Sequence, residues 1–111
     1  MNKYQTYIVV FENKGLLHGY NPDQFHNKIT AAKGIVSWWH YLSNSYILIV
    51  DRGVTATDIT KYLQTFTAKT KFLVSELNLK NHNGYLTQEA WDWINNELKL
   101  QDESNTGYNN I

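Results

Sequence analysis

The 111-residue chain contains no cysteine, a single proline and no long hydrophobic run. Without cysteine there can be no disulfide, no thiolate nucleophile, no iron–sulfur cluster and no cysteine-ligated zinc. No apolar run approaches the roughly 18 residues that a membrane span needs, and residues 1–5 lead into a strand-like segment with no signal-peptide apolar region. We therefore expect a cytoplasmic protein with no membrane partner.

The common motifs of enzymes and nucleotide-binding proteins are also missing. The glycines form neither a phosphate-binding loop nor a dinucleotide fingerprint, and no serine lies in a nucleophile elbow. The four histidines (His18, His26, His40 and His82) have no metal-ligand spacing. From these residues alone we expect no bound cofactor.

Charge is balanced overall but unevenly distributed. Ten Lys and Arg residues offset ten Asp and Glu residues, so net charge gives no argument for nucleic acid. Residues 1–88 carry nine bases against five acids, a net charge of +4, whereas the remaining part is acidic. The body of the domain is therefore mildly basic and the C-terminal part acidic.

Hydrophobic periodicity predicts alternating strands and helices. Strand-like runs occupy residues 4–11, 35–41, 46–51 and 71–77, with a hairpin turn at 42–45. A first helix is expected from Asn21 as N-cap to Gly34, and a second from a capping box of Thr55 and Asp58. A third helix is expected after Thr87, opened by a hydrophobic staple.

The order β-α-β-β-α-β predicts an α+β, ferredoxin-like fold. Both helices then lie on one face of a four-stranded antiparallel sheet with strand order 4-1-3-2, and the third helix follows at the C-terminal end. We expect one domain over residues 1–100 and a disordered tail over residues 101–111, because the tail is polar and has no period.

The densest signal is the run Trp38-Trp39-His40 on the second strand. Adjacent strand residues point to opposite faces, so one Trp can enter the core while the other needs a cover. A partner subunit, the third helix and stacked bases are all candidate covers. The pattern does not decide which Trp is buried. For His40, both a strand histidine hydrogen-bonded to a neighbour and a catalytic base are open readings.

Residues 34–42, 45–49 and 72–77 resemble small bacterial proteins labelled SinR-like, most specifically at Trp38-Trp39-His40. These are similar to the ferredoxin-fold subunit of CRISPR adaptation and to virulence-associated ribonuclease toxins. The resemblance implies a homodimer in which a carboxylate at the end of the first strand, here Glu12, takes part in metal-dependent phosphodiester cleavage. Aspartate is usual at that position in this group, so the glutamate puts Mg²⁺ geometry in doubt.

Two hypotheses for function follow, with a third behind them. The first is a homodimeric interaction module without its own catalysis, binding protein or nucleic acid in phage defence or mobile-element biology, through Trp38, Trp39 and His40. The alternative is a Mg²⁺-dependent nuclease using Glu12, with phosphates held by Lys14, Lys69 and Lys71. A small molecule bound on the open face of the sheet is the third.

Overall fold

The computed structural model describes residues 3–12, 22–67 and 70–104 of the chain. Its elements are β1 (Tyr4–Phe11), α1 (Pro22–Thr30), β2 (Ile35–Leu42), β3 (Ser45–Asp51), α2 (Ala56–Gln64), β4 (Phe72–Glu76) and α3 (Gln88–Ser104). The strands form one antiparallel sheet in the order β2-β3-β1-β4. The predicted α+β fold, with strand order 4-1-3-2, is confirmed.

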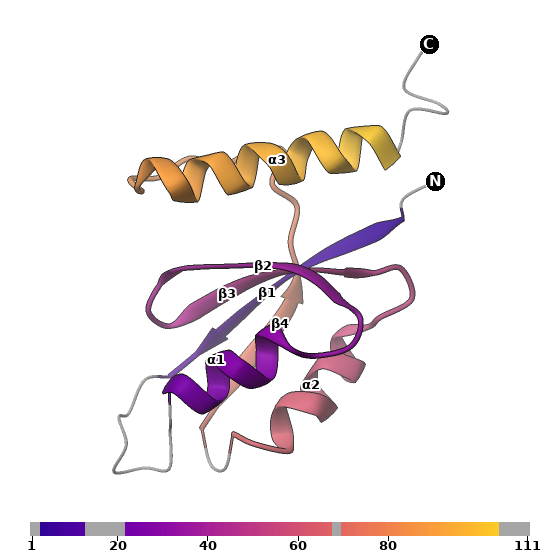
Figure 1. The fold of residues 1–111 in the computed structure, drawn as a ribbon, viewed down its shortest axis with the longest axis vertical. Coiled ribbons are helices and arrows are strands. Elements are labelled where there is room, and N and C mark those ends of the chain that lie inside the picture. The colour runs from indigo at the N-terminus through magenta and orange to yellow at the C-terminus, as the bar shows by residue number, and fades with distance from the viewer. Residues whose placement is uncertain (1–2, 13–21, 68–69, 105–111) are drawn as a thin grey trace.

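The first face of the sheet is covered by α1 and α2, which lie on the opposite side from α3 (Figure 1). Alternate residues of β1 and β3 point into this layer and meet the apolar stripes of the two helices. The buried core contains Tyr7, Val9, Phe11, Phe25, Ile29, Tyr46, Leu48, Val50, Ile59 and Leu63. Alternation at a period of two on the strands and of about 3.6 on the helices therefore produces one contiguous core.

Local signals in the sequence set several of the element boundaries. The side chain of Thr55 accepts a hydrogen bond from the Asp58 N–H, and the Asp58 carboxylate accepts one from the Thr55 N–H, so the capping box of α2 is confirmed. The β2–β3 hairpin is also confirmed, with a turn of only two residues at 43–44. The N-cap predicted at Asn21 lies outside the described residues.

The second face of the sheet is covered by α3. A second buried cluster joins the sheet, the loop before α3 and the helix itself: Trp39, Ile47, Leu79, Ala90 and Ile94. Two indole N–H groups fasten the layers, since Trp39 Nε1 donates to the Ala90 carbonyl at 3.2 Å and Trp93 Nε1 donates to Ser37 Oγ at 2.9 Å. The sequence leaves three candidate covers open for this face of the sheet, and in the structure the third helix covers it.

The third helix is longer than the sequence pattern indicates. It continues to Ser104, past residue 100 where the periodic pattern ends, and the remaining tail residues lie outside the described part of the chain. No helix among residues 3–12, 22–67 and 70–104 has the length and apolar character required to cross a membrane.

Candidate functional site

The two adjacent tryptophans of β2 are divided between the two faces of the sheet. Trp39 is 2 % exposed and packs beneath α3, whereas Trp38 is 39 % exposed and lies on the α1 side. Pairing fixes this choice, because Trp39 is opposite Ile47, which also faces α3. Of the two, Trp38 is therefore the one available for a binding partner, and Trp39 is a core residue.

Next to Trp38, two histidines pack around the hydroxyphenyl ring of Tyr46. The His40 ring stacks on the Tyr46 ring with centroids 3.9 Å apart and planes 3° apart. The His26 ring lies 6.0 Å from that of His40 and meets the Trp38 indole edge-on at 4.8 Å. This His–Trp cluster, made of His26, Trp38, His40 and Tyr46, joins α1 to the edge of the sheet.

Hydrogen bonding assigns the proton on His40. Its Nδ1 lies 2.9 Å from the carbonyl oxygen of Ser45, which can only accept, so Nδ1 carries the hydrogen. The neutral ring then has its lone pair on Nε2, and the side chain is half-buried rather than enclosed. His40 matches the reading of a strand histidine bonded to its neighbour, and it still presents a nitrogen that can accept a hydrogen bond or a proton.

His26 is a site residue that sequence reasoning did not select. Its Nδ1 lies 2.8 Å from the Tyr46 hydroxyl, and the helix position next to buried Phe25 brings it over the sheet edge. The only local signal is its place beside the apolar stripe of the first helix. Contact with His40 depends on how α1 crosses the sheet, which spacing along the chain does not reveal.

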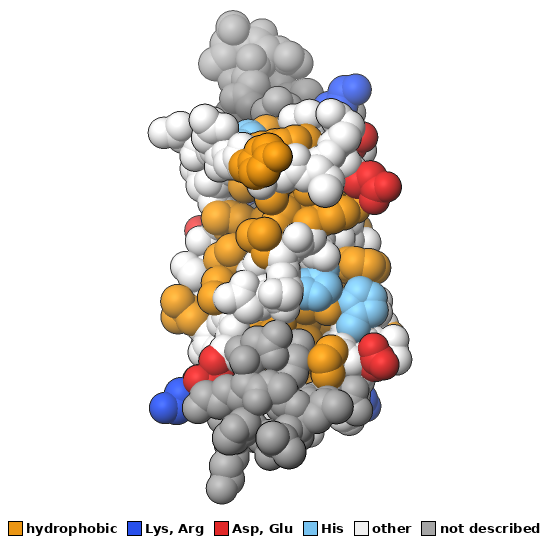
Figure 2. Space-filling model, turned by 90° about the vertical axis from the view of Figure 1, so that its left-hand side faces the viewer, with side chains coloured by type: hydrophobic (Ala, Val, Ile, Leu, Met, Phe, Trp, Pro, Cys, Tyr) orange, Lys and Arg blue, Asp and Glu red, His pale blue; other side chains and the backbone are white. Residues whose placement is uncertain are grey.

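The outer edge of β2 carries exposed hydrophobic side chains. Val36, Trp38, Tyr41 and Leu42 are each at least 39 % exposed, and the strand contains no charged residue. In Figure 2, hydrophobic side chains gather in a band below α3, histidines lie together beside it, and the Lys and Arg side chains visible on this face lie toward its ends. An uncharged apolar edge of this kind favours a protein or aromatic partner.

Glu12 lies at the end of β1, close to the start of β4. Its Oε1 accepts a hydrogen bond from the Lys71 N–H at 3.1 Å, and its own N–H donates to the Lys71 carbonyl at 3.0 Å. Glu12 and Lys71 therefore lie at the same end of the sheet, while Lys14 and Lys69 lie outside the described residues. Glu12 thus extends the pairing of β1 with β4.

The donor set around Glu12 does not by itself fit a metal. Among the side chains that the structure describes, no group of three or more His, Asp or Glu residues could hold an ion. A Mg²⁺ site normally draws on carboxylates together with substrate phosphates and waters. A metal at Glu12 would therefore need ligands from a second protomer or a substrate.

A buried carboxylate lies beneath α3 on the other side of the sheet. Glu97 is 1 % exposed, and its Oε2 accepts a 2.6 Å hydrogen bond from the Thr6 hydroxyl of β1. Its Oε1 finds no hydrogen-bond partner among the residues that the structure describes. Burial raises the pKa of the Glu97 carboxyl, and the hydrogen bond from Thr6 offsets this only in part.

Comparison of the chain with protein-family models gave no match, and comparison with curated proteins and with solved structures gave none either. The similarity to SinR-like proteins therefore remains a prediction from the residues of β2, β3 and β4.

Proposed function

We propose that the chain is a small non-catalytic interaction module of the cytoplasm that forms a homodimer through the edge of β2. The observation that carries this proposal is the composition of that edge. The eight residues of Ile35–Leu42 include no Lys, Arg, Asp, Glu or Pro, and several expose apolar side chains. Soluble proteins normally protect an edge strand with charge, proline or a covering element, because its free N–H and C=O groups invite another strand.

The opposite edge of the sheet is protected in these ways. There β4 has five residues, ends at Glu76 and directly follows Lys71. A short edge bounded by charges discourages strand addition. The contrast between the two edges supports β2 as the proposed interface.

A second copy of the chain is the partner that this edge fits best. An antiparallel pair of identical β2 strands obeys two-fold symmetry, and it brings no like charges together because the strand has none. Register shifts between Ile35 and Ser37 and between Trp39 and Leu42 limit the regular stretch to the middle of β2. Contacts of exposed side chains such as Val36 and Trp38 must therefore add to the backbone pairing.

A lysine placed on the β2 edge is expected to separate the dimer. Val36→Lys puts a charge at a side chain that is 48 % exposed in the single chain, so the fold should persist while dimer formation would bury an unpaired charge in the apolar interface. The matched control is Leu73→Lys on β4, where the side chain is 66 % exposed. Light scattering after size-exclusion chromatography should give a dimer for wild type and Leu73→Lys and a monomer for Val36→Lys.

The same measurement can refute the interface. A wild-type chain that is monomeric at tens of micromolar would refute the proposed homodimer. A dimer that survives Val36→Lys but dissociates with Leu73→Lys would move the interface to β4. Circular dichroism of each variant establishes that any change in mass does not come from unfolding.

Nucleic acid is the second kind of partner that the His–Trp cluster supports. An exposed indole provides a stacking platform for a base, and imidazole nitrogens provide hydrogen bonds. Adding a short single-stranded RNA to the light-scattering experiment distinguishes a nucleic-acid partner from a protein partner. An increase in mass that Trp38→Ala abolishes supports RNA binding. A dimer indifferent to RNA leaves a module for protein partners, in phage defence or mobile-element biology.

The metal-dependent nuclease at Glu12 stays a prediction from the resemblance, and it requires a different dimer. Two β2 edges joined side by side place both β3 strands and both β2 strands between the two β1 strands, so the Glu12 carboxylates would lie at least about 24 Å apart at ~4.8 Å per strand. That is too far to share one metal ion. The nuclease and the β2-edge dimer are therefore mutually exclusive for a shared site.

The nuclease has its own test. If Glu12 catalyses, Mg²⁺- or Mn²⁺-dependent cleavage of RNA or DNA should fall at least about 100-fold in Glu12→Gln, a loss typical for a group acting directly on the transition state. Glu76→Gln, on the exposed end of β4, is the control. Cleavage that persists in Glu12→Gln, or no cleavage by wild type with several RNAs and DNAs, contradicts this function.

A further inference from the structure

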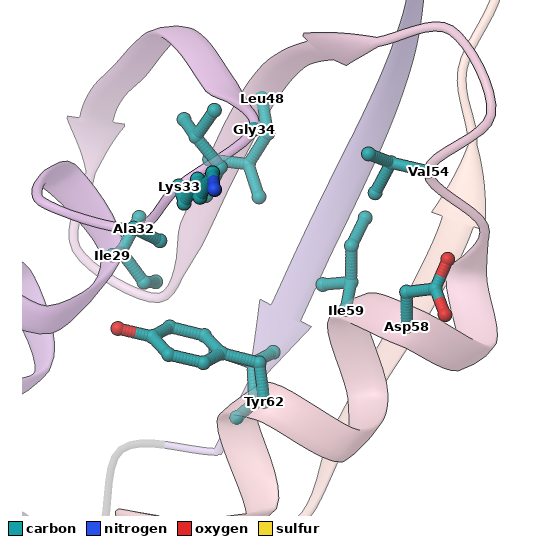
Figure 3. A pocket seen from close by; sticks show the side chains of 11 residues that line it. Ile29, Ala32, Lys33, Gly34, Leu48, Val54, Asp58, Ile59 and Tyr62 are labelled. Atoms are coloured by element: carbon teal, nitrogen blue, oxygen red, sulfur yellow. The ribbon is translucent and has the colours of Figure 1, made fainter.

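A cavity of about 290 Å³ lies between α1 and α2, above the first face of the sheet. Figure 3 shows Tyr62 reaching from α2 towards Ile29 and Ala32, with Val54 and Ile59 on the opposite side. The Tyr62 hydroxyl donates to the Lys28 carbonyl of α1 at 2.7 Å and so bridges the two helices at one side of the opening. This cavity is separate from the His–Trp cluster and from the exposed edge of β2.

Small residues where α1 meets β2 leave this space unfilled. Ala32 and Gly34 provide little or no side chain, and Gly34 adopts φ +92°, a conformation that side chains other than glycine rarely take. A Cβ added at Gly34 would lie 3.5 Å from a methyl carbon of Val54. The cavity is therefore built into the connection between α1 and β2.

The size and lining of the cavity define the body of a ligand. An apolar cavity of about 150 Å³ holds benzene, so one of about 290 Å³ admits a fused two-ring group or a branched chain. Its walls are formed mainly by aliphatic side chains of α1, β3 and α2. Such walls favour an apolar group and offer few hydrogen bonds.

The charges at the opening define the polar end of the ligand. Lys33 lies at the rim and is exposed, and within the described part of the chain no ion pair with it is found. Asp58, the acidic residue of the lining, accepts a 2.9 Å hydrogen bond from the Thr55 N–H in the capping box. The Asp58 carboxylate thus takes part in the cap of α2, whereas the Lys33 ammonium remains available to a ligand.

We propose that this cavity binds a small monocarboxylic acid with a flat or branched apolar body, the apolar part between α1 and α2 and the carboxylate at Lys33. The site needs no dimer and no nucleic acid, so this proposal can be tested independently of the proposed β2-edge interface.

Three probes with one ring system test the proposal on the full chain. Indole-3-acetate, indole and tryptamine carry a negative, no and a positive charge, and backbone amide NMR titrations follow each. We expect saturable shifts at residues 32–35, 54–59 and 62, with indole-3-acetate binding about 3- to 5-fold more tightly than tryptamine, the size expected for one exposed ion pair. Lys33→Gln should remove that preference and leave indole unchanged, whereas Lys80→Gln, on the loop before α3, should retain it.

A cavity-filling variant provides the second arm. Ala32→Phe places a ring in the space between the helices and should abolish binding of all three probes, with the amide spectrum showing that the fold is kept. If that variant unfolds, Lys33→Gln, which changes an exposed side chain, still tests the proposal through the loss of the preference for the acid. Absence of saturable shifts at millimolar probe, shifts confined to other residues, or an acid preference that Lys33→Gln does not alter would overturn the proposal.

Discussion

Trp39→Ala is expected to lower the free energy of unfolding by about 3–5 kcal/mol, the usual cost of truncating a fully buried tryptophan. The Trp39 side chain is 2 % exposed and lies at the centre of the cluster that joins the sheet to α3. Its removal leaves a cavity and also deprives the Ala90 carbonyl of the indole N–H. Because α3 has no other layer to pack on in the described structure, we expect this helix to lose its docking first.

The neighbouring residue provides a matched control. Trp38→Ala removes the same side chain from the other face, where it is 39 % exposed and makes an edge contact with His26, so the expected cost is about 1 kcal/mol. Urea unfolding of both variants in the Val36→Lys background keeps dimer formation out of the comparison. An equal decrease in the free energy of unfolding in the two variants would contradict the assignment of Trp39 to the interface with α3.

Glu97→Gln is expected to stabilise the protein at neutral pH by about 1–3 kcal/mol, because it replaces a buried carboxylate with a neutral amide of the same shape. Glu97 is 1 % exposed, and within the described part of the chain one of its carboxylate oxygens lacks a partner. Glutamine keeps the shape and still presents an oxygen to the Thr6 hydroxyl, but carries no charge. The measurement is urea unfolding of wild type and variant at a series of pH values.

The direction of the pH dependence follows from the raised pKa of Glu97. Below about pH 4.3, the ordinary glutamate value, the carboxyl is protonated in both the native and the unfolded chain, so it carries no ionisation penalty. Between that value and the higher native pKa, the carboxyl loses its proton in the unfolded chain but not in the native one, so native stability falls as pH rises. Above the native pKa both states are ionised and the loss of stability is constant. Wild type and Glu97→Gln should therefore diverge as pH rises from 4 to 8.

A second carboxylate on α3 serves as the control for that divergence. Glu89 lies in the first turn of the helix and is exposed, so Glu89→Gln should retain the wild-type pH profile. A Glu97→Gln profile parallel to wild type would show that burial of this carboxylate does not affect the docking of α3.

The topology could be predicted because local and periodic signals agree with each other along the chain. The capping box at Thr55 and the apolar stripes of both helices each specify their element without help from distant residues. The third helix was predicted, but its role as the cover of the second face was only one of three alternatives that the sequence left open. That role depends on a loop of irregular structure before residue 88, whose path has no periodic signature.

The candidate site was predicted only in part, for reasons of register and crossing angle. Alternation places Trp38 and Trp39 on opposite faces, but β3 is buried on both faces, so its pattern could not say which face each Trp takes. Glu97 did carry a signal, because it follows Ala90 and Ile94 at the spacing i, i+4, i+7 of a buried stripe. A carboxylate on such a stripe marks a buried charge, which the acidic composition of residues 89–103 does not distinguish from the exposed acids around it.

The division of the molecule into two clusters has a consequence for its synthesis on the ribosome. Every residue of the cluster beneath α1 and α2 has been translated once β4 ends at Glu76, whereas the cover of Trp39 and Ile47 arrives only with α3. At about 5–20 residues per second, the stretch from Glu76 to Ser104 takes a few seconds to make. Until α3 docks, the nascent chain exposes this apolar face of the sheet, so we expect chaperones to bind it and chains truncated before α3 to aggregate.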